Sequence, residues 1–130
     1  KIENVDAHLY HYRFNNQSLV NTFNEKRINN LIGVVKEIEL FLQNKDLLDK
    51  YSTDLLVMKI RVKASVICES TVLLQKKYQS IYSEIDERIN HEKSISKVKR
   101  IATCLILKKK YYLGNFLLVL MRLVRKIKYR

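Results

Sequence analysis

The 130-residue sequence contains no proline, no tryptophan and only two glycines, Gly33 and Gly114. Proline interrupts helices and glycine weakens their interiors, so the scarcity of both leaves long stretches free to form helices. Two isolated glycines also cannot build a glycine-rich loop around a phosphate. Because 47% of the residues are hydrophobic, the chain is expected to fold as one domain around a real core.

Cysteine is nearly as scarce. Cys68 and Cys104 both lie in apolar sequence that favours helix, and neither has a partner at Cys-x-x-Cys or Cys/His ligand spacing. We expect buried free thiols in a reducing compartment. The sequence also lacks a Ser-His-Asp arrangement, so it predicts no catalytic residue, metal or cofactor within these 130 residues.

Long hydrophobic runs are absent as well. Residues 116–121 form one of the longest apolar stretches, far short of the roughly 20 residues that a membrane-spanning helix requires. Acidic residues are missing from the C-terminal third: residues 93–130 contain 12 basic and no acidic side chains, whereas residues 1–92 contain 13 of each. The whole net charge of +12 therefore belongs to the C-terminal part.

What is present predicts a mainly α-helical protein, a bundle of four to five helices preceded by one short strand. Apolar residues recur at helical spacing in segments 23–43, 47–77 and 78–90, then from Ser94 to about Lys110, and finally over 112–130. Thr22 and Glu25 have the spacing of a capping box at the start of the first helix, and Ser94 is a candidate N-cap. Residues 23–130 thus form the predicted helical domain.

The last predicted helix is both apolar and basic. One arc holds Leu113, Phe116, Leu117, Leu120, Met121, Val124 and Ile127, and the opposite side gathers Arg122, Arg125, Lys126 and Arg130. Leu118 and Val119 break this separation. Such a helix can lie on an anionic membrane surface through Phe116, Leu117, Leu120 and Val124, with Arg122, Arg125 and Lys126 at the headgroups. The alternative is that its apolar side packs on the bundle. Nucleic-acid binding is disfavoured because no recognition motif accompanies the charge.

The N-terminal region has a different pattern. In Leu9-Tyr10-His11-Tyr12-Arg13 the aromatic side chains alternate with the others, as in a short β-strand. A polar loop containing Ser18 and Leu19 follows, and the next helix includes Lys26-Arg27. This order resembles the segment that follows the catalytic acidic motif in bacterial family 2 glycosyltransferases of the GT-A type that build surface polysaccharides. The resemblance covers about twenty residues, and residues 1–22 would continue from a catalytic domain.

The resemblance implies a C-terminal piece of a larger enzyme, inactive alone. The family's nucleotide-binding half, its Asp-x-Asp metal site for Mg or Mn and its catalytic base would all lie upstream. Arg13 and Ser18 match positions beside the nucleotide-sugar phosphates, and His11 shares a strand face with Arg13. The alternative is that Arg13 pairs with a carboxylate such as Asp6 and that His11 is a packed surface residue.

The sequence therefore predicts a non-catalytic helical region of a glycosyltransferase that transfers a sugar from a nucleotide-sugar donor in cell-surface polysaccharide synthesis. Its expected partners are its own upstream catalytic domain and an anionic membrane, at the inner face of the cytoplasmic membrane; self-association is left open. The alternative is a stand-alone basic helical module that binds nucleic acid or a protein partner.

Overall fold

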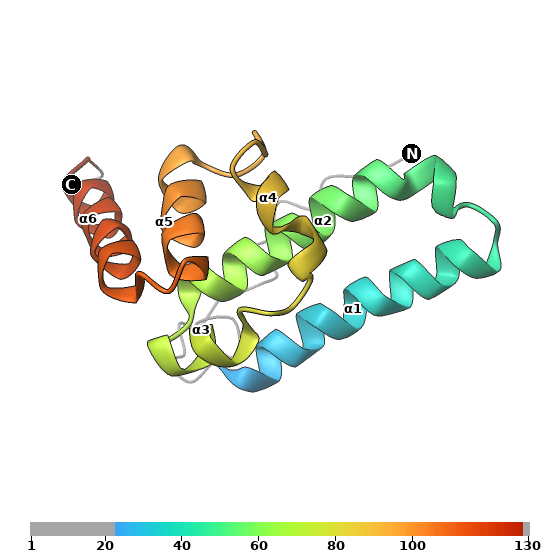
Figure 1. The fold of residues 1–130 in the computed structure, drawn as a ribbon, viewed down its shortest axis with the longest axis horizontal. Helices are drawn as coiled ribbons and strands as arrows, with labels where there is room; N and C mark the ends of the chain where they lie inside the picture. Colours follow the sequence, from blue (N-terminus) through green and yellow to red (C-terminus); the bar gives the residue numbers. More distant parts are fainter. Residues whose placement is uncertain (1–22, 129–130) are drawn as a thin grey trace, which may run out of the picture.

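The computed structural model describes residues 23–128. Over this range the chain is mainly helical, as predicted, but residues 23–128 form six α-helices and one short 3-10 helix, η1, instead of the four to five helices expected (Figure 1). The predicted strand, its loop and the residues His11, Arg13 and Ser18 lie outside the described residues.

The first two helices form a long antiparallel hairpin. α1 spans Glu25–Asn44 and α2 spans Leu48–Glu69, and they lie side by side in Figure 1. Ile28, Val35 and Leu42 recur every seven residues along α1, and all three are buried. The predicted capping box with Thr22 as N-cap is wrong. The N-cap is Asn24, whose side-chain oxygen accepts a hydrogen bond from the Arg27 amide at 3.0 Å.

The predicted helix over 47–77 is two helices. α2 ends at Glu69, Ser70 and Thr71 are extended, and α3 spans Val72–Tyr78. The break is stabilised by side chains that satisfy the carbonyls freed at the end of α2. The Gln75 amide donates to the carbonyl of Ile67 at 2.9 Å, and Arg122 donates to the carbonyl of Cys68 at 3.2 Å.

The predicted helix over 78–90 is also interrupted. Tyr82 has a left-handed backbone (φ 48°), and only η1, Ser83–Ile85, and α4, Asp86–Ile89, are helical. The turn is held from the core side by Lys63 of α2. Its fully buried amine pairs with the carboxylate of Asp86 and donates to the Tyr82 carbonyl at 3.5 Å. Bending the chain in this way brings Ile85 and Ile89 into the core.

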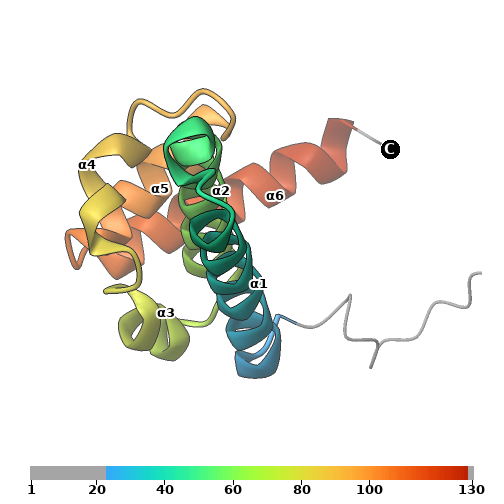
Figure 2. The same cartoon turned by 90° about the vertical axis from the view of Figure 1, so that its right-hand side faces the viewer.

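The last two helices form a second hairpin. α5 spans Lys97–Leu107 and α6 spans Tyr111–Lys128. The N-cap of α5 is Ser96, which accepts a hydrogen bond from the Lys99 amide at 3.4 Å; the predicted cap was Ser94. Figure 2 shows α6 running past α1 and α2, with its C-terminal end projecting beyond them.

Candidate functional site

The C-terminal helix packs closely on its neighbours along one side. Leu118 is buried in a cluster with Ile67, Cys68, Ala102 and Ile106 of α2 and α5. Gly114, one turn earlier, lies where a Cβ atom would come within 2.5 Å of Ile106 Cγ1. Glycine is therefore the residue that lets α6 approach α5 at this point. This side of α6 belongs to the core of the protein.

The opposite side of α6 is apolar too, but it is exposed. Leu113, Phe116, Leu120, Leu123 and Ile127 are spaced by three and four residues and so lie on one face of the helix. Between 41% and 77% of the surface of each is exposed. Tyr112, Val119 and Val124 are also exposed and widen this face. We call these eight residues the outward face of α6.

The structure separates the α6 residues that the sequence had grouped. Phe116, Leu120 and Val124 belong to the outward face, as the predicted surface requires. Leu117 is half-buried and packs against the Leu118 cluster. Leu118, which broke the sequence pattern, is the residue at the centre of the packed side. Leu123 was missed, although its place in the three-and-four spacing was a usable signal.

The basic residues predicted for the membrane surface, Arg122, Arg125 and Lys126, do not all have the same environment. The guanidinium of Arg122 donates to the carbonyl of Cys68 and closes the end of α2, so this residue is tied to the fold. Arg125 and Lys126 lie in the last two turns of α6. At the other end of the helix, Lys108, Lys109 and Lys110 are exposed in the turn between α5 and α6. Basic residues thus occur at both ends of the α5–α6 hairpin, and residues 93–130 bring no carboxylate to offset them.

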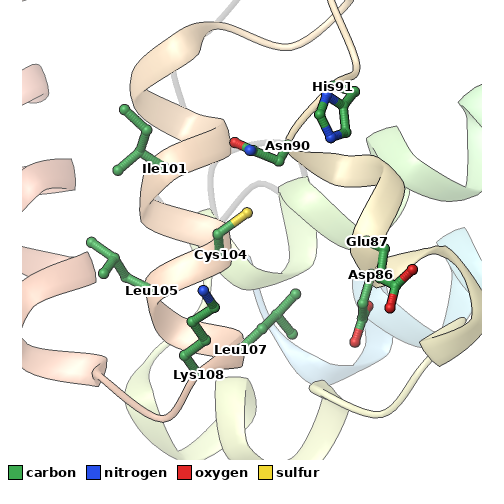
Figure 3. A pocket seen from close by; sticks show the side chains of 9 residues that line it. All are labelled: Asp86, Glu87, Asn90, His91, Ile101, Cys104, Leu105, Leu107 and Lys108. Atoms are coloured by element: carbon green, nitrogen blue, oxygen red, sulfur yellow. The ribbon is translucent and has the colours of Figure 1, made fainter.

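A separate depression of about 600 Å³ lies between α4 and α5. Figure 3 shows the Cys104 thiol pointing from α5 toward the end of α4, where Asn90 and His91 lie. Burial raises the pKa of Cys104, which keeps the thiol protonated and disfavours it as a nucleophile. Asp86, on the rim, is already paired with Lys63. Among residues 23–128, no three His, Cys, Asp or Glu side chains form a group that could hold a metal ion.

The second cysteine is more enclosed. Burial is the largest effect on the pKa of Cys68 and raises it, although a hydrogen bond with Thr103 at 3.3 Å opposes this. Both cysteines are free, as the sequence predicted, and Cys68 is buried while Cys104 is half-buried. Neither thiol has the lowered pKa of a catalytic cysteine. The outward face of α6 is therefore the stronger candidate for a functional surface.

None of the helices described within residues 23–128 combines the length and apolar character that crossing a bilayer requires. No protein-family model, curated protein or solved structure matches this chain.

Proposed function

We propose that the chain is the C-terminal helical region of a family 2 glycosyltransferase, and that α6 holds this enzyme on an anionic membrane surface. The transferase part rests on Tyr10, Tyr12 and Arg13 and on the loop and helix start that follow them. The enzyme would transfer a sugar from a nucleotide-sugar donor in cell-surface polysaccharide synthesis. It would work at the cytoplasmic face of the membrane, with Mg or Mn held by its catalytic domain.

The docking part rests on one observation: α6 has a large apolar face that the bundle does not cover. The packed side already contains Gly114 and Leu118, so the outward face is not needed to hold the fold. Each Leu, Ile or Phe side chain that leaves water contributes at most about 1.5–3 kcal/mol. Each cation close to anionic lipid adds about 1 kcal/mol. A few side chains of each kind are therefore enough for reversible binding.

The same geometry favours lipid over nucleic acid. Nucleic-acid backbones are bound mainly by cations and hydrogen-bond donors, whereas the outward face consists of aliphatic and aromatic side chains. An acyl-chain boundary accepts such a face, and the basic residues of the hairpin can then meet the lipid phosphates.

The docking proposal is tested by sedimentation of the chain with vesicles. We expect binding to vesicles that contain phosphatidylglycerol, much weaker binding to phosphatidylcholine vesicles, and release as salt rises, because screening shortens the reach of the cations. Phe116→Ser combined with Leu123→Ser should reduce binding at least tenfold. Leu73→Ser on α3 is the matched control: Leu73 is 77% exposed. It lies about 200° around α3 from Gln75, the residue that contacts Asn115 of α6, so it points away from α6 and binding should not change.

Two results would overturn the docking proposal. One is equal loss of binding in the Leu73 control and the α6 double variant. The other is competition by random-sequence duplex DNA that is as effective as competition by anionic lipid, which would favour the nucleic-acid alternative. Deletion of residues 112–130 is a poor test, because it also removes Leu118 from the core.

The transferase part is tested independently. The coding sequence upstream of Lys1 should encode an Asp-x-Asp motif and a later acidic motif close to the Tyr10 segment. In that full-length enzyme, Arg13→Ala should weaken phosphate contact and reduce transfer by roughly 1.5–3 kcal/mol, and Ser18→Ala should cost less. Unchanged kinetics with a lower melting temperature in Arg13→Ala would show that Arg13 is structural.

A further inference from the structure

The α1–α2 hairpin carries an apolar groove near its turn at residues 45–47. This end of the hairpin is the one farthest from α5 and α6 in Figure 1. Its volume is about 380 Å³, and it lies between Ile38 and Phe41 of α1 and Tyr51 and Met58 of α2, with Leu55 at its base. Phe41 is 58% exposed and Val34, two turns earlier in α1, is 54% exposed. Large apolar side chains therefore surround a hollow at the surface.

The residues around the groove have the spacing of a helix-bundle interface. Ile38 and Phe41, which line the groove, are three residues apart on α1. Val34 lies outside the groove, four residues before Ile38, and continues the same face. Tyr51, Leu55 and Met58 repeat the same spacing on α2. Two parallel rows of this kind are what one helical hairpin presents to another in a four-helix bundle.

The position of Glu39 shows which side of the hairpin is already covered. Glu39 follows Ile38 and so points about 100° away from it around the helix. Its carboxylate accepts a hydrogen bond from the Lys59 amine at 2.8 Å, and the same amine lies 3.7 Å from the carboxylate of Glu84 in η1. η1 thus lies on the Glu39 side of the hairpin, and the groove occupies the other side.

Charge indicates what can cover the groove. Residues 34–59 contain four basic and five acidic side chains, whereas residues 93–130 contain 12 basic and none acidic. Two copies that met through α6 would bring like charges together; two copies that met through the hairpin would not. Lys50 and Asp54 are both exposed and lie one turn apart on α2. When the α2 helices of two copies lie antiparallel and are related by a two-fold axis, Lys50 of each copy can lie opposite Asp54 of the other.

We propose that two copies of the chain associate through this groove, with α1 and α2 of one copy packed antiparallel against α1 and α2 of its partner. The contact leaves the outward face of α6 free in both copies. It does not depend on membrane docking.

Sedimentation equilibrium without lipid, over a range up to millimolar protein, tests this directly. The unmodified chain should be a dimer, and Phe41→Glu should raise the dimer dissociation constant at least tenfold by placing a carboxylate in the groove. Leu40→Glu is the matched control, because Leu40 is the adjacent residue, is 42% exposed and does not line the groove. Circular dichroism of each variant verifies that the helices are intact.

A charge exchange tests the antiparallel arrangement. Lys50→Glu and Asp54→Lys should each weaken the dimer, and the double variant should restore it. A chain that stays monomeric throughout the range would overturn the proposal. So would dissociation by Leu40→Glu as large as that by Phe41→Glu, or a dimer that is lost in Leu123→Ser and kept in Phe41→Glu, since that would place the contact on α6.

Discussion

Replacing Gly114 by alanine is expected to destabilise the protein, although alanine is the better helix former. A Cβ atom at position 114 would come within 2.5 Å of Ile106 Cγ1 and within 3.0 Å of the Ala102 carbonyl oxygen. The first atom can move only if Ile106 leaves the single χ1 rotamer that β-branched residues strongly prefer in a helix, and the second belongs to the backbone, so neither yields easily. α5 and α6 must move apart to accommodate the methyl group.

Gly33 provides the matched control for the size of this effect. A Cβ atom added there would meet no other atom within 4 Å. Gly33→Ala should therefore stabilise the protein by about 0.5–1 kcal/mol, the usual gain inside a helix. Gly114→Ala has the same gain but adds overpacking, which typically costs about 1–3 kcal/mol. The helix-propensity term is common to both, so the difference between the two variants measures the closeness of α5 and α6.

Urea unfolding followed by circular dichroism gives this difference, provided that the m-values agree. We expect Gly114→Ala to be less stable than Gly33→Ala by about 1–3 kcal/mol. In an Ile106→Ala background the difference should shrink, because the closest atom has been removed. Equal stability of the two glycine variants would refute the close approach of α5 and α6, and with it the packed position of Leu118.

Two further predictions concern ion pairs. Asp86→Ala should leave the buried Lys63 amine without its carboxylate. Breaking a buried ion pair typically lowers the free energy of unfolding by roughly 3–5 kcal/mol, and we expect a value near the lower end because Asp86 is partly exposed. Lys63→Met should cost less, and the reverse order in urea unfolding would contradict the pairing of the buried Lys63 amine with Asp86. Hydrogen bonds from Lys77, and then from Tyr78, lower the pKa of Glu25. The Glu25 carboxylate therefore stabilises the fold above the ordinary glutamate pKa, and this contribution is lost as pH falls through the lowered pKa. Glu25→Gln should flatten the dependence of stability on pH in this acid range, and an unchanged dependence would show that the Glu25–Lys77 pair contributes nothing.

Local sequence signals were enough to predict α1, α5 and α6. Each combines a helical apolar period with polar boundaries, and the predicted ends differ from the observed ones by a few residues. The capping residues were less predictable, because Asn24 and Ser96 each lie two residues after an equally suitable candidate. Which of the two candidate residues caps the helix depends on where the helix must begin in order to bury its apolar side chains.

The breaks at Ser70 and Tyr82 depend on contacts that local sequence does not contain. The apolar pattern continues through Val72 and Leu74, but Gln75 and Arg122 bind the carbonyls at the end of α2, and Arg122 is more than fifty residues away. Likewise, the turn at Tyr82 depends on Lys63, a residue that is normally exposed and is here fully buried. Periodicity cannot reveal a partner that belongs to another helix.

Apolar periodicity alone also could not predict which side of α6 packs on the bundle. The side that remains exposed supports the proposed membrane docking. A helix that only packs on a bundle needs one apolar stripe, and its other side is normally polar. α6 instead has Leu118 and Gly114 on the packed side and Phe116, Leu120 and Leu123 on the outward side. Because both sides are apolar, the sequence pattern could not decide which one meets the bundle. The exposed apolar outward side and the acid-free cationic segment around it support the proposal that α6 docks on a surface that is both apolar and anionic. A membrane surface has both properties, whereas the charge-balanced groove of the α1–α2 hairpin is better suited to another copy of the chain.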